Sequence, residues 1–341
     1  MSPSTSRALA RREALLWAGF AAWPLVVRLL ARGAALLGPD ASLARAALVA
    51  ALTLAATVSG PIAAALSLRR LDASAPRSRH PGLVLAAFAL TAAPALYALL
   101  STVTFLDWVT GALPFLWIAV AALGAVAPHL RASPAPFVDE RRAPASWRWR
   151  ALHGGAAVLV ATFAAAHVLN HLASLHSLAA HARVMAALRV VYRHPVAEVL
   201  LVAAVVVQLV SGVRLAWRAR LTPATAVRDV QLLSGATLAA FLVSHATAVF
   251  VLARGVLHVD PSFSWAMGGP RGLLAPGALV HLLPYYGLGV LALFAHIASE
   301  WVTNLAHVVG RRWAGRIAAS LFAAGVTVAL ALMGSLSFPR G

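Results

Sequence analysis

Long apolar stretches separated by short polar segments dominate the pattern of the chain. Several stretches exceed about 18 residues, which is long enough to cross a bilayer and longer than most buried helices of soluble proteins. The pattern predicts an all-α, polytopic membrane protein with about nine transmembrane helices. We expect these spans at residues 14–36, 43–67, 82–104, 112–130, 152–174, 195–217, 231–254, 278–303 and 314–335.

Composition agrees with this class and excludes others. Of the 341 residues, 61% are hydrophobic and 11% are charged, which is outside the range of soluble globular chains. The net charge is +18 and all 28 basic residues are arginines. These arginines lie mostly in short loops, so we expect a lipid bilayer and no nucleic acid as partner. The chain has no Cys, which excludes disulfides, covalently attached haem and iron–sulfur ligation within it.

Arginine-rich and arginine-poor loops alternate along the chain. The rich segments are 69–80, 130–150, 214–229 and 310–316. The positive-inside rule then places the N-terminus in the cytoplasm and the C-terminus outside. We therefore expect a multi-pass protein of a bacterial inner (cytoplasmic) membrane. Segment 175–194 becomes an outer loop, in which His176 and His181 are expected to be solvated.

Residues 131–150, which contain several Arg and Pro residues, divide the chain. Residues 1–130 form an expected four-helix transmembrane module with almost no polar chemistry inside its spans. Residues 151–341 form an expected five-helix bundle that contains nearly all of the histidines inside spans. We interpret 131–150 as a cytoplasmic linker between the two parts and assign no role to the first part.

Five histidines fall inside spans of the second part, namely His167, His171, His245, His281 and His296. Ionisable groups inside lipid are costly and are usually functional. One histidine often serves helix packing or lines a polar cavity, but five point toward a cofactor. His167 and His245 each lie about 15 residues into an outward-running span, on the order of 22 Å from its cytoplasmic end. Two imidazoles at one depth can bind one haem iron from both sides, whereas zinc or copper more often takes three or four close ligands.

Two other histidines relate to this pair. His171 follows His167 by one turn on the same helix face, so it is either an alternative haem ligand or a contact to a haem propionate. His296 lies on an inward-running span at a level about 10 Å or more closer to the cytoplasm. No other histidine is expected at that level, where the nearest polar candidate is Gln208.

Residues 150–335 resemble the membrane-anchor cytochrome b subunit of succinate dehydrogenases and fumarate reductases, in its single-chain type with five helices and two haems. The resemblance rests on FAAAHVLNH, YRHPVAEVLLVAAVVVQLVSG, QLLSGATLAAFLVSHATAVF and YYGLGVLALFAHIASEW. In the third stretch, Gln231, Gly235 and His245 match the family's Gln, Gly and ligand His. The family pattern pairs the ligands of the first and third stretches in the outer haem, which here are His167 and His245.

The inner haem of that family takes its ligands from the second and fourth stretches. The fourth offers His296, but Gln208 stands where the second should have a His, four residues before its Gly. We therefore expect one haem b at the outer level and an inner haem that is absent or substoichiometric. His296 would then be the ligand of a five-coordinate haem or a remnant.

Glu198 and His281 are candidate residues for a quinone and its protons. His281 lies near the outer end of the eighth span, where Pro284 frees backbone groups and can open a pocket. Glu198 begins the sixth span on the same side, and quinol oxidation needs a proton acceptor. The alternative for Glu198 is an interfacial ion pair with Arg193. Glu300, near the cytoplasmic exit, is expected to meet a loop arginine.

The resemblance implies an electron-transfer subunit that exchanges electrons between quinone or quinol and a b-type haem. It also implies iron–sulfur and flavoprotein partner subunits on the cytoplasmic face. Nothing in this chain could hold flavin or bind a dicarboxylate in water, so we expect no dehydrogenase activity from the chain alone. The alternative is a non-redox membrane protein with the same fold, such as a transporter or a sensor of haem or quinone. The first four spans contain almost no charged residues, which disfavours transport.

Overall fold

The computed structural model describes residues 3–35, 43–106, 113–130, 146–221, 224–268, 272–274 and 279–338. Every regular element in these ranges is helical, which confirms the all-α expectation. The elements are α1 (Pro3–Ala21), α2 (Trp23–Ala35), α3 (Leu43–Asp72), η1 (Arg77–Arg79), α4 (Pro81–Leu106), α5 (Leu113–Leu130), α6 (Ser146–Leu172), η3 (Ala173–Leu175), α7 (Leu178–Tyr192), α8 (Pro195–Ala219), α9 (Ala226–Ala246), the π-helical η4 (Thr247–Val256), α10 (Phe263–Ala266), α11 (Leu282–Val309) and α12 (Arg311–Ser337).

Seven candidate membrane spans occur in the described part of the chain. They correspond to α3, α4, α6, α8, α9 with η4, α11 and α12. An eighth is possible if α1 and α2, which meet at a bend of 44°, count as one span. The expected span 112–130 is α5, whose apolar part, Leu113–Ala127, is shorter. Length and apolarity therefore support seven or eight spans in the described ranges, where the hydropathy pattern predicted nine.

The bend between α1 and α2 has an identifiable cause. Pro24 has no backbone N–H, so the carbonyl of Phe20, four residues earlier, lacks its helical donor. The indole Nε1 of Trp117 in α5 donates to that carbonyl at 2.8 Å, and its ring stacks on Phe20 with the ring centres 4.2 Å apart. Both aromatic side chains are fully buried. A proline in one helix thus creates the site to which another helix attaches.

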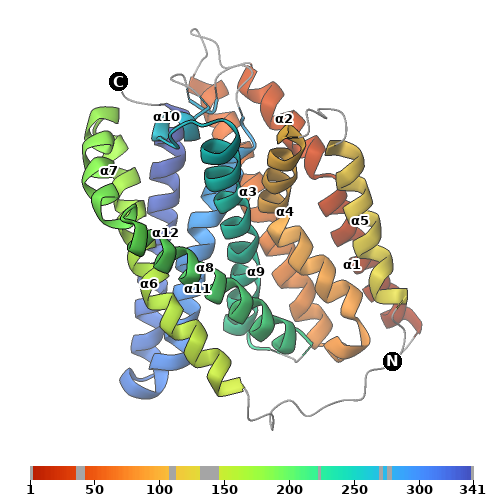
Figure 1. The fold of residues 1–341 in the computed structure, drawn as a ribbon. Coiled ribbons are helices and arrows are strands. Elements are labelled where there is room, and N and C mark those ends of the chain that lie inside the picture. Colours follow the sequence, from red (N-terminus) through yellow and green to blue (C-terminus); the bar gives the residue numbers. More distant parts are fainter. Residues whose placement is uncertain are drawn as a thin grey trace.

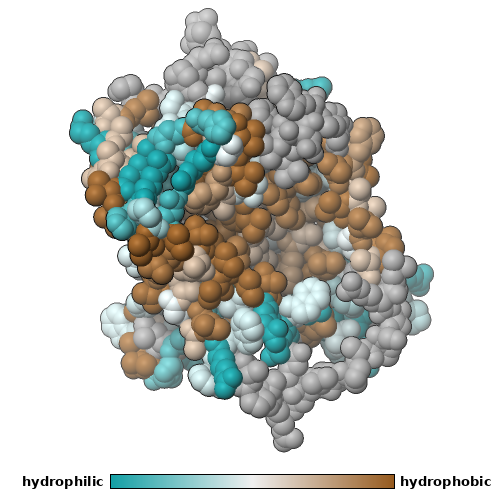
Figure 2. All heavy atoms as spheres, viewed as in Figure 1, coloured by the Kyte–Doolittle hydropathy of each residue, from teal (hydrophilic) through white to brown (hydrophobic). Residues whose placement is uncertain are grey.

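Helices α6, α8, α9, α11 and α12 form a bundle, and the N-terminal helices cover one side of it through α4 and α3 (Figure 1). The described chain starts at the lower end of this view and finishes at the upper end. Hydrophobic residues form a belt across the middle of the molecule, with hydrophilic residues gathered nearer the two ends (Figure 2). This distribution suits a protein whose middle contacts lipid tails.

The two parts of the chain share hydrophobic clusters. Leu233 of α9 belongs to the cluster built by α1, α2, α3, α4 and α5. Tyr285 of α11 packs with Ala95 and Ala98 of α4. Of the expected linker 131–150, residues 131–145 lie outside the described residues, and the remainder forms the start of α6.

The segment expected as an outer loop, 175–194, is mainly the helix α7 at the upper end of Figure 1. Its first turn is capped by Ser177, whose hydroxyl accepts the N–H of Ala180 at 3.0 Å. The helix turns His181 inward, so the expectation that this side chain is solvated is wrong, because only 2% of it is exposed. His176, just before the cap, is exposed.

A buried arginine joins the two parts at the lower end. Arg77 of η1 is fully buried. Its Nε donates to Asp72 Oδ1 at 2.7 Å, and its Nη2 donates to Asp72 Oδ2 at 2.6 Å and Asp229 Oδ1 at 2.5 Å. Asp229 lies in the first turn of α9, where the positive end of the helix dipole also stabilises its carboxylate. One guanidinium therefore neutralises a carboxylate from each part.

We predict that Arg77→Met lowers the free energy of unfolding by about 3–5 kcal/mol, because it leaves two carboxylates facing each other without a buried cation. Thermal or denaturant unfolding in detergent micelles measures the effect. The matched control is Arg79→Met, since Arg79 is exposed two residues away. Adding Asp229→Asn to Arg77→Met should recover part of the loss, and equal stability of the two single variants would contradict the prediction.

Candidate functional site

His167 and His245 form the upper pair of the site. They face each other between α6 and α9, with ring centres 6.1 Å apart and ring planes at 67°. Each ring stacks on a phenylalanine four residues earlier in its own helix, Phe163 with His167 and Phe241 with His245. Such i, i+4 contacts hold each imidazole in one orientation. The structure therefore brings together His167 and His245, the two histidines that we paired from their equal depth in the membrane.

Further polar side chains extend from the upper pair toward α7. His171 Nε2 lies 3.1 Å from His167 Nε2. Asn170 Nδ2 donates to His181 Nε2 at 3.2 Å, and burial lowers the pKa of His181, which favours the neutral ring. Phe263 of α10 covers His171 and His181, with ring centres 5.5 and 4.7 Å away. His171 thus hydrogen-bonds to His167, the expected haem ligand, and packs against the ring of Phe263.

His153 and His296 form the lower pair of the site. Their ring centres are 6.4 Å apart and their planes are at 82°. The expectation that no other histidine lies at the level of His296 is therefore wrong. The sequence pattern contained a signal, because His153 precedes His167 by 14 residues, which is about four helical turns on nearly the same face. The expectation overlooked it because His153 stands at the very start of the expected span.

Gln208 lies beside the lower pair on α8. Its Nε2 is 3.1 Å from Nε2 of His153, and Ser211, one turn later, places its Oγ 3.0 Å from His153 Nδ1. The other amide atom, Oε1 of Gln208, is buried without a hydrogen-bond partner among the described residues. Gln208, which stands where the resemblance led us to expect a histidine, thus contacts a histidine from α6.

Glu300 ends a polar chain at the lower side of the site. Gln231 Nε2 donates to Glu300 Oε1, and Arg228 in turn donates to Gln231 Oε1. Asn304 donates to the other carboxylate oxygen. The expected contact between Glu300 and a loop arginine is thus indirect and passes through Gln231.

An open groove of about 620 Å³ lies between α8 and η4 at the upper end. Its lining residues are Pro195, Glu198, Val199, Val202, Ala203, Phe250 and Arg254. η4 continues α9 directly after His245, so the groove and the upper pair share one continuous helical segment. Such π-helical segments are frequent at functional sites. An apolar groove that contains one carboxylate and one guanidinium suits a ligand with an apolar body and a polar head.

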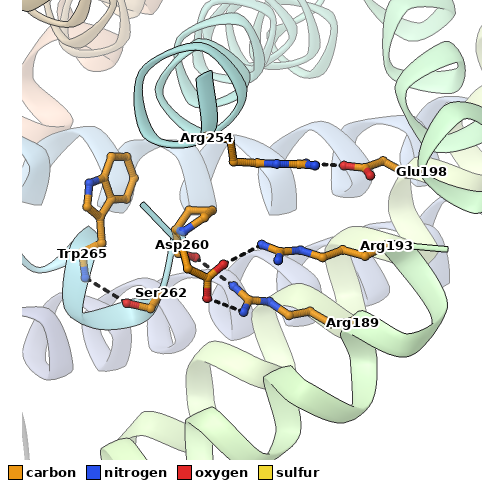
Figure 3. A network of polar contacts seen from close by, with 8 residues as sticks. Arg189, Arg193, Glu198, Arg254, Asp260, Ser262 and Trp265 are labelled. Carbon is orange, nitrogen blue, oxygen red and sulfur yellow. Dashed lines mark hydrogen bonds and ion pairs between the residues drawn. The ribbon is translucent and has the colours of Figure 1, made fainter. Parts of the chain in front are cut away.

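Figure 3 shows how the charged residues around the groove pair. Arg254 donates to Glu198, whereas Arg193 donates to Asp260 at 2.9 Å and Arg189 donates to the same carboxylate at 2.6 Å. The expected alternative partner of Glu198, Arg193, is therefore the wrong one. The two ion pairs of Asp260 join the C-terminal end of α7 to the segment after η4.

His281 does not line the groove that contains Glu198. Its ring meets Tyr97 of α4 edge-on, with the ring centres 5.5 Å apart. Tyr285, one turn later in α11, hydrogen-bonds with Ser244 of α9, next to His245, at 3.1 Å. His281 thus lies beside α4, where the N-terminal helices meet the bundle. Glu198 lies in the groove between α8 and η4.

Comparisons place the chain beside no known protein. No family model, no curated protein and no solved structure matches it. Within the described ranges, no group of three or more His, Asp or Glu side chains is arranged to hold a metal ion. The two histidine pairs and the groove are therefore the features from which a function can be inferred.

Asp260 gives a test of the upper-end geometry. Burial raises the pKa of this carboxyl, but hydrogen bonds and positive charge from Arg189 and Arg193 outweigh burial and lower it. The unfolded value is about 3.9. Stabilisation by Asp260 is therefore complete above that pH and disappears as pH falls through the lower folded-state pKa.

We predict that Asp260→Asn lowers the Tm at neutral pH and that the difference from the unaltered protein shrinks below about pH 4. Thermal unfolding of both proteins in detergent across this range measures it. A difference that stayed constant or grew on acidification would contradict the assigned ion pairs.

Proposed function

We propose that this chain is a membrane electron-transfer subunit in which His167 and His245 bind the iron of a b-type haem. The observation that supports it is the 6.1 Å separation of the two ring centres across the bundle. A bond between a metal and an imidazole nitrogen is about 2.0 Å long, so two rings on opposite sides of one metal have centres roughly 6 Å apart. The resemblance of residues 150–335 to succinate dehydrogenase and fumarate reductase cytochrome b points the same way.

The surroundings of the upper pair fit such a group. Among the described residues, no hydrogen bond engages the ring of His245, which leaves a nitrogen available as a ligand. Asn170 Oδ1 is buried and has no partner in the described part of the chain, so a polar group of a ligand would satisfy it. His171 would give up its hydrogen bond to His167 and, with Asn170, would face the polar edge of the bound group.

The groove beside η4 is our proposed quinone site. Its apolar wall accommodates an isoprenoid tail, while Arg254 can donate to a quinone oxygen and Glu198 can accept a proton from a quinol hydroxyl.

Oxidising one quinol to one quinone releases two protons and two electrons. Bound haem would supply one-electron redox chemistry between quinol and the partner subunits. Glu198 takes one proton at its carboxylate oxygen and passes it to water, since 26% of its side chain is exposed. A second such cycle removes the second proton. His281 is proposed as a further polar residue on the quinone side.

The partners of this electron path are proposed from the same geometry. The connections from α3 to α4, α8 to α9 and α11 to α12 all lie toward the lower end (Figure 1), and they and the adjoining helix ends are rich in arginine. On the positive-inside rule this end is cytoplasmic, in a bacterial inner membrane, with the N-terminus on the same side. An iron–sulfur subunit and a flavoprotein would dock there, because the chain itself has no Cys to ligate a cluster.

We predict that His245→Ala removes the visible absorbance of the haem that the upper pair would hold, since one of its two proposed iron ligands is lost. Absorption spectra of the purified full chain, oxidised and reduced, measure it. The control His176→Ala changes an exposed histidine near the same end and should leave the spectrum intact. An unaltered chain without any haem absorbance would contradict the proposed function and favour the non-redox alternative.

We predict that Glu198→Gln keeps the haem absorbance but slows reduction by added quinol at least tenfold, because the proton acceptor is lost. Stopped-flow absorbance with a soluble quinol measures the rate. Glu300→Gln, at the opposite end of the site, is the matched control. Normal rates in Glu198→Gln together with slow rates in Glu300→Gln would move the quinone site to the lower end.

A further inference from the structure

The lower pair repeats the geometry of the upper pair with residues that sequence patterns alone did not combine. His153 comes from α6 and His296 from α11, and their ring centres are 6.4 Å apart. This separation again matches two imidazoles on opposite sides of one metal, roughly 6 Å between ring centres. Both histidines are partly buried inside the bundle.

The hydrogen bonds of His296 leave Nε2 as its lone-pair nitrogen. Nδ1 lies 3.1 Å from the carbonyl oxygen of Gln231. A carbonyl only accepts, so Nδ1 must carry the proton. Ser234 Oγ, at 3.3 Å, supports the same orientation. Metal-binding histidines commonly donate their other ring N–H to a backbone carbonyl in this way.

The same reasoning applies to His153. Ser211 Oγ donates its single proton to the Val207 carbonyl at 2.5 Å, so it accepts from Nδ1 of His153 at 3.0 Å. Nε2 of His153 is then unprotonated and accepts from the Gln208 amide at 3.1 Å. Both rings of the lower pair thus have Nδ1 bonded to the protein and the lone pair on Nε2; in His153 that lone pair accepts from Gln208.

Each ring of the lower pair also rests against a glycine of another helix. A Cβ at Gly212 of α8 would lie 3.0 Å from Cε1 of His153, and a Cβ at Gly235 of α9 would lie 3.1 Å from Cε1 of His296. Any larger residue would push on the imidazoles. The two glycines therefore provide the space in which these rings fit between the helices.

Gln208 is the residue that would have to turn for Nε2 of His153 to bind a metal. Its Oε1 is buried without a partner in the described part of the chain, which costs free energy. Another staggered rotamer of the Gln208 side chain would turn the amide away from His153 and free Nε2, at the loss of one hydrogen bond. Gln208 therefore does not block ligation by His153.

We propose that His153 and His296 would hold the iron of a second b-type haem, so that α6 supplies one ligand at each level and Gln208 is not a ligand. This inference rests on the proposed function, because it takes the same cofactor as the upper pair. It replaces the expectation of an absent or substoichiometric inner haem. His153 and His167, 14 residues apart on α6, then mark two haem levels about 21 Å apart along the helix.

The test is haem quantitation on the full chain purified with its own haem. The unaltered chain should contain two haems per chain, and His153→Ala and His245→Ala should each contain one. The double variant should contain none. Gln208→Leu is the matched control beside the lower pair and should keep both haems.

Three outcomes distinguish this inference from the proposed function. One haem per chain that is insensitive to His153→Ala and lost in His245→Ala overturns the lower pair and leaves the proposed function intact. Two haems that both survive His153→Ala overturn it as well. No haem in the unaltered chain overturns both proposals.

His153→Met supplies a second readout if the alanine variant folds poorly. Methionine can still ligate iron and raises the reduction potential of the haem it holds. We expect the haem content to stay at two while one of the two midpoint potentials rises in a redox titration. Two unchanged midpoints would show that residue 153 does not ligate, since a merely structural role would not shift a potential selectively.

Discussion

An imidazole between apolar helices lowers the stability of the fold unless its nitrogens have partners, and this constraint organises the whole bundle. Within the described residues, the lower pair meets it with a carbonyl from α9 and with a hydroxyl and an amide from α8. In the upper pair His167 has such a partner in His171, whereas His245 stacks on Phe241 and has no hydrogen bond among the described residues. Each partner fixes a ring orientation, so the requirement for hydrogen bonds also preorganises the site. The glycines beside the lower rings provide the space that oriented imidazoles need.

The same requirement explains why the N-terminal helices belong to the bundle. Arg77 is buried only because Asp72 of its own part and Asp229 of α9 neutralise it together. Asp229 begins the helix that contains Gln231, Gly235 and His245, so the ion pair holds the lower end of the helix that contributes to both levels. The first part of the chain thus has at least a positioning role, in addition to the cover that α4 gives to α9 and α11.

Helical rise and hydropathy account for the features that the sequence predicts correctly. The all-α fold and the shared level of His167 and His245 depend on counting residues from a span boundary, and the rise per residue makes that count reliable. Counting residues along one helix does not predict which side chains of neighbouring helices contact each other. His153 stood at a boundary, where a count begins, and its nearness to His296 depends on how α6 and α11 pack. α7 was missed because its mixture of Arg, His and small residues lacks the hydropathy of a span. The burial of Arg77 was missed because Asp229, one of its two carboxylate partners, lies 152 residues away.

The spacing of the histidines on α6 also concerns the membrane voltage. Two redox centres about 21 Å apart along one helix would lie at different depths of a hydrocarbon core about 30 Å thick. An electron that moved between them would cross most of the electric field, which acts on one full crossing with about 2.3 kcal/mol per 100 mV. If both levels held a haem as proposed, the redox equilibrium between them would depend on the energised state of the membrane.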